Sequence, residues 1–367
     1  MKKHIFTAII FATATLSCTK SNLVEVPQSQ ETPITFEVYN GKAPMTKAIS
    51  IIGATGEPDN GQSLAEAGGF HVTAFKTTDY TSAYFNKDMA WSTNAWAATD
   101  NYDVFWPGDA TLDFLAFGNN VSDKEVTSNG VTPVDLISPI SPATDGSFTQ
   151  FTYNVPDNVA EQEDLVVSAK VTTKLSETNG GAVQLEMKHI LSRIGFKVNV
   201  SGSAAVVINE ITLYGAFSTS GTVDLTATTP AIAPLENDQE EVVRTPTSYS
   251  LLPGDTSFSP VANQTQQIHS GTAENAENCY MMVIPGTVGD YATNTKPYIH
   301  IEYTLGGVEN EKDIPLTLDN TATGANMVFE AGKAYEYLFT ISAAKIDFTG
   351  SVVNWDETGI DPGTPLN

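Results

Sequence analysis

Alternating apolar and polar residues constrain the fold of this chain more than any other feature. Apolar side chains occupy every second position in three long runs, Ile194 to Val200, Ile299 to Leu305 and Tyr335 to Ile341. A period of two gives a strand one buried and one solvated face, as in antiparallel sheets that pack face to face. Glycine and proline turns interrupt these runs throughout the chain. The sequence therefore predicts an all-β protein built from sandwiches.

A polar, glycine-rich segment near the middle of the chain marks the predicted domain boundary. It reads Ser176-Glu177-Thr178-Asn179-Gly180-Gly181, and apolar strand patterns lie on both sides of it. Each side has enough apolar sequence for a core of its own. We therefore expect an N-terminal β-sandwich domain over residues 34–178 and a C-terminal one over residues 182–367.

The N-terminus has the pattern of an export signal. A short basic head, Met1 to His4, precedes about ten apolar residues, too few to span a bilayer as a helix. Cys18 follows this apolar stretch, at the position where bacterial lipoproteins are cut and acylated. The pattern predicts a signal peptide over residues 1–17, lipidation (with palmitate) at Cys18, and a polar tether over residues 18–33. The alternative is an ordinary signal peptide whose cysteine is incidental.

The chain is strongly acidic, which limits its partners. It carries 18 basic and 43 acidic residues, for a formal charge of −25. Loss of Lys2 and Lys3 with the signal peptide changes this charge to about −27. Such a surface repels nucleic acid and anionic lipid headgroups, and it keeps an exported protein soluble. If Cys18 is acylated, Cys279 is the only remaining cysteine, and no disulfide can form within the chain.

The sequence contains no recognisable catalytic or metal-binding motif. No pair of its five histidines, and no histidine with Cys279, has a metal-ligand spacing, and His71 and His300 lie on the polar faces of strands. Phosphate-binding loops and the hydrolase and zinc-protease motifs are missing from the sequence. Carboxylate pairs such as Asp100 with Asp103, or Asp109 with Asp113, are expected by chance among 43 acidic residues. Because the two acids of a glycosidase can lie far apart in the sequence, this pattern does not exclude glycosidase activity. We predict no catalytic residue, no metal site and no cofactor.

Three tryptophans lie close together in the sequence and allow two interpretations. Trp91, Trp96 and Trp106 fall within sixteen residues of one another. An exposed row of such rings would form a sugar-binding platform, whereas buried rings would pack in a sandwich core. Packing is the favoured interpretation.

Six runs of residues keep a consistent order over nearly the whole mature chain. Together with the lipoprotein signal, they resemble the fimbrillins of Bacteroidales, the subunits of type V pili, in their Mfa-like branch. The resemblance implies two tandem transthyretin-like (Greek-key) β-sandwich domains. It also implies export to the cell outer membrane as a surface-exposed lipoprotein, and polymerisation into a fimbrium. The six runs are Trp91 with Val104–Gly108 and Leu112–Phe117, then Asp164–Ser168, Leu185–Ile194, Tyr280–Gly286, Gly332–Tyr337 and Ile346–Trp355.

In such pilins a protease removes an N-terminal strand, and a donor strand from a neighbouring subunit fills the groove that is left. Ile34, Phe36 and Val38 alternate as such a first strand should. A cut after Lys47 would free this strand and leave Ala48 as the new N-terminus.

The expected cleavage site departs from the family pattern. The family's site often carries arginine, whereas this chain has only Arg193 and Arg244, both far inside the sequence. Lys47, or else Lys42, takes the place of that arginine.

The C-terminal tail, residues 346–355, is the candidate donor strand. Ile346, Phe348 and Val352 share one phase, which then slips to Val353 and Trp355, as expected at a β-bulge.

The sequence and the resemblance favour a structural pilin subunit that is not an enzyme and that assembles with copies of itself or related pilins. Two alternatives remain open. One is a pilus tip or anchor adhesin of the same fold, which would bind a host protein or glycan in cell adhesion. The other is a glycan-binding surface lipoprotein.

Overall fold

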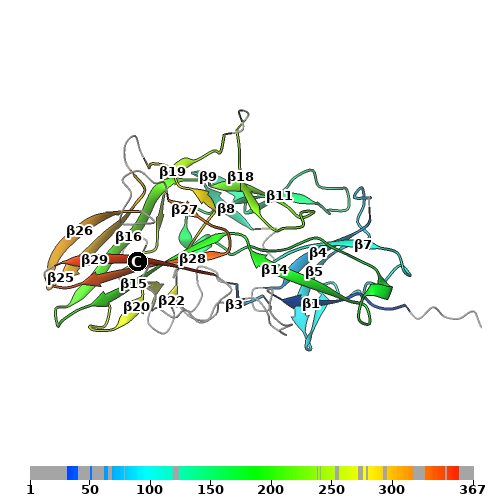
Figure 1. The fold of residues 1–367 in the computed structure, drawn as a ribbon, viewed down its shortest axis with the longest axis horizontal. Coiled ribbons are helices and arrows are strands. Elements are labelled where there is room, and N and C mark those ends of the chain that lie inside the picture. Colours follow the sequence, from blue (N-terminus) through cyan, green and yellow to red (C-terminus); the bar gives the residue numbers. More distant parts are fainter. Residues whose placement is uncertain are drawn as a thin grey trace, which may run out of the picture. The chain divides into compact units, whose positions relative to one another are not determined.

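The computed structural model describes most of the chain from residue 31 onward. The described residues are 31–39, 50–51, 62–64, 68–77, 79–118, 124–237, 239, 241–252, 256–271, 276–277, 280–291, 296–316, 327–343 and 345–354. They form strands and two short 3-10 helices, η1 (Val159–Glu161) and η2 (Leu175–Glu177). The all-β class predicted from the alternating pattern is therefore confirmed (Figure 1).

The largest sheet brings together the first strand and strands from much later in the chain. In spatial order it contains β1 (Thr35–Tyr39), β14 (Ala182–His189), β12 (Val166–Ser168), β7 (Leu112–Gly118), β4 (Phe70–Lys76), β5 (Phe85–Ser92) and β6 (Ala95–Ala98), and β13 (Val171–Thr173) also pairs with β7. A second sheet has the order β10 (Ile137–Pro139), β11 (Gln150–Asn154), β17 (Ser220–Asp224) and β18 (Ile232–Pro234).

Two further sheets contain the three runs with the clearest alternation. One has the order β20 (Thr265–Gln267), β15 (Ser192–Val200), β28 (Lys333–Ile341) and β29 (Ile346–Asn354), with β23 (Tyr280–Val283) also paired to β15. The other has the order β19 (Thr245–Ser250), β16 (Val206–Phe217), β25 (Tyr298–Leu305) and β26 (Val308–Pro315). Four two-stranded ladders complete the fold: β2 (Ser50–Ile51) with β3 (Gln62–Ser63), β8 (Glu125–Ser128) with β9 (Val131–Asp135), β21 (Ser270–Gly271) with β22 (Ala276–Glu277), and β24 (Gly286–Thr287) with β27 (Val328–Phe329).

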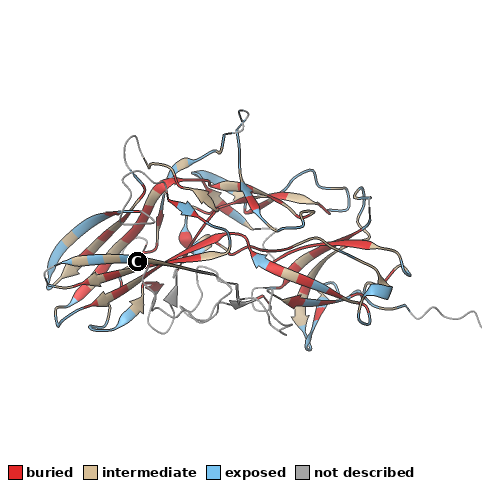
Figure 2. Ribbon diagram, viewed as in Figure 1, coloured by how far each residue is buried: buried red, intermediate tan, exposed pale blue. Residues whose placement is uncertain are grey.

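Burial follows the predicted period of two. In β25 the side chains of Ile299, Ile301 and Tyr303 are buried, and His300 and Glu302 between them are partly exposed. The same alternation of buried and more exposed residues recurs along other strands (Figure 2). One face of each such strand therefore supplies the core.

Not all strands pair in the antiparallel sense that the alternation suggested. β1 runs parallel to β14, and β15 runs parallel to β28 over eight residue pairs. Alternation reports that one face of a strand is buried, but it carries no information about the direction of the neighbouring strand.

The predicted boundary between residues 178 and 182 lies within the first sheet. β14 begins at Ala182, directly after this boundary, yet it pairs with β12 and β1 on the N-terminal side. In addition, β11 from before the boundary pairs with β17 from after it. The segment at residues 178–182 is thus a turn that joins two elements of one sheet, and the division of the chain into two domains stays a prediction. A linker between two domains and a turn within one sheet can both be polar and glycine-rich, so composition does not distinguish them.

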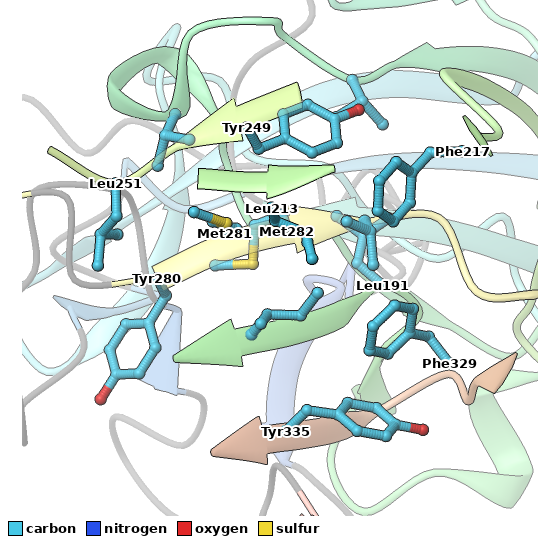
Figure 3. Close-up of a cluster of buried hydrophobic side chains, with 14 of the residues drawn as sticks. Leu191, Leu213, Phe217, Tyr249, Leu251, Tyr280, Met281, Met282, Phe329 and Tyr335 are labelled. Carbon is cyan, nitrogen blue, oxygen red and sulfur yellow. The ribbon is translucent and has the colours of Figure 1, made fainter. Parts of the chain in front are cut away.

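The apolar side chains form two clusters. The smaller one is lined by the first sheet and includes side chains of β1, β4, β7 and β14. The larger one extends from Phe75 to Ile341 and includes strands of the other sheets. Figure 3 shows side chains of β16, β19, β23 and β28 gathered in it, among them Leu213, Tyr249 and Met282.

Candidate assembly site at the first strand

β1 contributes its whole apolar face to the smaller core. Ile34, just before the strand, and Phe36 and Val38 within it are each at most 8% exposed. The ring of Phe36 packs edge-on against Phe70, with ring centroids 5.7 Å apart, and against Phe114 at 6.2 Å. The alternating sequence of this segment thus produces an edge strand whose apolar face lies in the core.

Hydrogen bonds hold the start of β1 in place. The amide of Ile34 donates to the Val104 carbonyl at 2.8 Å, and the amide of Thr35 donates to the Gly181 carbonyl at 3.2 Å. The Trp106 amide donates to the Thr32 carbonyl at 3.0 Å. The indole Nε1 of Trp106 also donates to the Gly181 carbonyl, at 3.1 Å. The Val104–Trp106 segment and the turn before β14 therefore hold the start of β1 from two directions.

Gly181 allows this approach of two backbones. Its φ is +96°, and a Cβ atom placed on it would lie 2.4 Å from the Pro33 carbonyl oxygen. Real Cβ contacts are never this short, so a larger residue would have to displace the segment that leads into β1. The sequence identified Gly181 only as part of a turn. The tandem glycines after Asn179 were a signal of positive φ, but not of which segment approaches them.

β1 lies at the end of its sheet and has one hydrogen-bonded neighbour among the described strands. β1 lies beside β14 (Figure 1). Phe36 is in register with Val183, and Val38 is in register with Leu185, both on β14. β1 also contacts β6, the strand at the opposite end of the sheet. An end strand with one partner is the kind of element that another strand can replace.

The tryptophan cluster packs rather than forming an exposed platform. Trp96 and Trp106 are 8% and 5% exposed, and Trp91 is partly buried against Trp96 at a centroid distance of 5.2 Å. The favoured interpretation of these three residues is therefore confirmed. The structure adds that Trp106 lies beside the start of β1.

Replacing Trp106 by phenylalanine is expected to lower the free energy of unfolding by about 0.5–1.5 kcal/mol beyond any loss of packing, the typical net value of one hydrogen bond. The loss stays modest because the Gly181 carbonyl keeps its bond from Thr35. Urea unfolding measures it, with Trp91→Phe as the matched control for trimming an indole. An effect no larger than that of the control would show that the indole N–H contributes nothing.

The candidate donor strand pairs within its own chain. β29 runs antiparallel to β28 along its full length, from Ile346 opposite Ile341 to Asn354 opposite Lys333. The ring of Phe348 stacks on Tyr337 with centroids 5.2 Å apart and planes 12° apart. Ile346, Phe348 and Val352 pack, partly buried, against the larger core.

The bulge predicted before Val353 is wrong. Val352 and Val353 follow each other opposite Tyr335 and Ala334 with no register shift. Gly350 faces Tyr337 in this ladder, and a Cβ atom there would lie 3.1 Å from the tyrosine ring. The gap in the apolar pattern at Gly350 thus makes room for an aromatic side chain, which sequence periodicity cannot reveal.

Several predicted site residues lie outside the described part of the chain. These are Cys18 of the lipidation site, Lys47, Ala48 and the alternative Lys42 of the cleavage site, Trp355 of the candidate donor strand, and Cys279. Their roles stay predictions.

The acidic pairs noted in the sequence make structural contacts. Asp109 accepts a hydrogen bond from the Ser176 amide at 2.9 Å, and hydrogen bonding to Ser176 lowers the pKa of its carboxyl group. Asp113 is buried and accepts hydrogen bonds from the hydroxyls of Tyr80 and Thr172. These carboxylates are therefore occupied in joining loops and strands.

The polar residues of the run from Leu185 to Val200 also have structural partners. His189 Nδ1 lies 2.7 Å from Asp164, with both side chains buried. Arg193 lies 3.7 Å from Glu336 and covers the ring of Tyr280 at 4.3 Å. Both basic residues therefore have acidic partners within the fold.

Comparison with known proteins now identifies the family. A family model described as fimbrillin-like matches residues 55–355. The chain belongs to the fimbrillin-like family.

A solved structure of a fimbrial protein has a similar fold. The fimbrillin-like chain is similar to a fimbrial protein from Bacteroides vulgatus ATCC 8482, with 16% identity and a TM-score of 0.52, over 88% of this chain and 99% of that chain. It also matches a candidate cell adhesion protein from Bacteroides uniformis ATCC 8492, with 15% identity and a TM-score of 0.45, over 88% and 98% of the two chains. No curated protein matches it.

Within the described ranges, no helix has the length and hydrophobicity needed to cross a bilayer.

Proposed function

We propose that this fimbrillin-like chain is a structural pilin subunit that polymerises by exchanging strands with other copies or related pilins. It is exported as a lipoprotein acylated at Cys18, held at the outer membrane surface, and incorporated into a fimbrium after cleavage near Lys47. It acts without catalysis or a cofactor. Family membership supports a pilin-like structural role, and the proposal of strand exchange rests on β1.

The observation that carries the proposal is the position of β1. This strand lies at the end of its sheet, pairs with β14, and directly precedes the segment that contains Lys42 and Lys47. The side chains of Phe36 and Val38, and of Ile34 just before the strand, are buried, and each burial is worth about 1.5–3 kcal/mol when the side chain is fully desolvated. While β1 remains covalently attached, this burial keeps it docked. After cleavage only noncovalent contacts retain it.

Loss of β1 would create a surface that favours replacement. The edge of β14 would lose its partner along Val183 and Leu185, and the rings of Phe70 and Phe114 would lose their contact with Phe36. An unpaired edge above an apolar trough is a template for another strand.

β29 has side chains that match this trough. Ile346 and Phe348 repeat the spacing of Ile34 and Phe36, because both strands contain an Ile-x-Phe sequence. β29 is also an end strand with β28 as its partner. If β29 moved to a neighbouring subunit, it would lose its ladder with β28 and gain a ladder with β14 of the acceptor. Covering the exposed apolar trough of the acceptor would favour this transfer.

Limited digestion of the purified soluble protein with a trypsin-like protease tests the proposal. Cleavage after Lys47 is expected to produce a ladder of multimers on a denaturing gel without boiling. Phe348→Ala should reduce the yield of multimers by about tenfold or more, because a buried aromatic side chain is lost from the donor. Thr349→Ala, on the exposed face of the same strand, is the matched control.

A peptide spanning residues 33–39 provides a second measurement that does not depend on how a variant folds. Added during cleavage, it should occupy the trough and shorten the ladder. Intact monomers that persist after complete cleavage at Lys47 would contradict strand exchange, as would a ladder insensitive to both Phe348→Ala and the peptide.

A further inference from the structure

One face of the sheet that contains β16, β25 and β26 carries a row of like charges. Glu210 on β16 is in register with Glu302 on β25, and Glu302 is in register with Glu311 on β26. Like charges placed directly opposite each other across strands are destabilising, and the chain already has a formal charge of −25. A bound cation would reduce the repulsion between these carboxylates.

His300 lies beside these glutamates on β25. Its Nδ1 is 2.6 Å from Asp313 Oδ1, and its Nε2 is 3.4 Å from Glu302 Oε1. One ligand atom from each of Glu210, His300 and Glu302 can be chosen so that all three lie within 4.8 Å of one another. A carboxylate on one ring nitrogen commonly orients a histidine that binds metal through the other. Asp313 holds His300 in this way.

An irregularity in β16 places Glu210 in this group. The register shifts between Ile208, opposite Tyr303, and Glu210, opposite Glu302, so that Asn209 is an extra residue on β16. The Thr212 hydroxyl donates to Glu210 Oε1 at 2.7 Å and helps to fix this carboxylate. The bulge thus brings Glu210 to His300, which is ninety positions away in the sequence.

The ion pairs described for this cluster are made by His300 itself, to Glu302 and Asp313. Together with Glu210, these two carboxylates place negative charge around the ring nitrogen at which a cation would bind.

We propose that Glu210, His300 and Glu302 bind one divalent transition-metal ion, best matched by Zn²⁺, and that Asp313 is a positioning residue. An imidazole nitrogen with two carboxylate oxygens suits zinc, whereas calcium and magnesium take oxygen ligands. Three protein ligands leave a fourth position for water. The ion links β16 to β25 across the bulge and neutralises the facing glutamates. These residues show no metal-ligand spacing in the sequence, because the three ligands come from two strands.

Titration of the purified, chelator-treated protein with Zn²⁺ tests the proposal, with binding measured by calorimetry and by the rise in Tm. One Zn²⁺ per chain is expected. Asp313→Asn should weaken binding by about 10–100-fold, the range typical of residues that orient a ligand. His300→Ala and Glu302→Gln should each weaken binding by more than Asp313→Asn does. Glu309→Gln, which removes one exposed carboxylate elsewhere on β26, is the matched control and should leave affinity unchanged.

Spectroscopy separates a built site from general attraction of cations by an acidic surface. Co²⁺ in place of Zn²⁺ should give the visible absorption of a low-coordinate site in the wild-type protein, and His300→Ala should abolish it. If His300→Ala fails to fold by circular dichroism, Glu302→Gln decides the result. The proposal is overturned by non-stoichiometric binding, by equal losses in Glu309→Gln and the ligand variants, or by preference for Ca²⁺ over Zn²⁺.

Discussion

Replacing Phe36 by alanine is expected to lower the free energy of unfolding by about 3–5 kcal/mol, the usual cost of removing a buried aromatic side chain. Phe36 is 8% exposed, and its ring contacts Phe70 of β4 and Phe114 of β7 in the core. The backbone of β1 remains fixed to β14 and Val104, so neighbouring side chains can close the cavity only in part. Urea unfolding followed by circular dichroism measures the loss.

Thr35→Ala is the control for Phe36→Ala, because Thr35 is exposed on the other face of the same strand. It should change stability by less than about 0.5 kcal/mol, as is usual for surface substitutions. Equal effects of the two substitutions would mean that β1 does not depend on its apolar face for docking. That result would remove the physical basis for strand exchange, whatever the outcome of the cleavage experiment.

Replacing Gly181 by alanine is expected to loosen β1 specifically. Backbone strain at its φ of +96° costs about 1–3 kcal/mol, and the contact of the new methyl group with the Pro33 carbonyl adds to this. The strand would yield at its start, where the amide of Thr35 bonds to the Gly181 carbonyl. Hydrogen exchange should then show faster opening of the β1 amides than of amides in β15 or β28.

Gly180→Ala separates backbone strain from the close approach. Gly180 also has a positive φ, +66°, but an added Cβ atom would meet nothing within 4 Å. We expect a loss of about 1–2 kcal/mol without selective opening of β1. If Gly180→Ala and Gly181→Ala gave the same exchange pattern, contact with Pro33 would not be what positions the first strand.

The sequence predicted the local features of the candidate assembly site well. The alternation of Ile34, Phe36 and Val38 indicated which side of β1 faces a core, and the packed tryptophans were the favoured interpretation of that cluster. The resemblance to fimbrillins, carried by short runs along the chain, agrees with the family match over residues 55–355. Whether Lys47 is cut and Cys18 is acylated remain predictions for experiment.

What the sequence alone determined is which residues form strands and which side of each strand is apolar, because alternation depends only on neighbouring residues. The tertiary structure decided which strands pair and where backbones meet: β14 lies beside β1 across a predicted boundary, and Gly181 lies against Pro33. It also brought Glu210 to His300. These contacts join residues far apart in the chain, and their geometry depends on strand order, register and bulges, none of which leaves a periodic trace in the sequence.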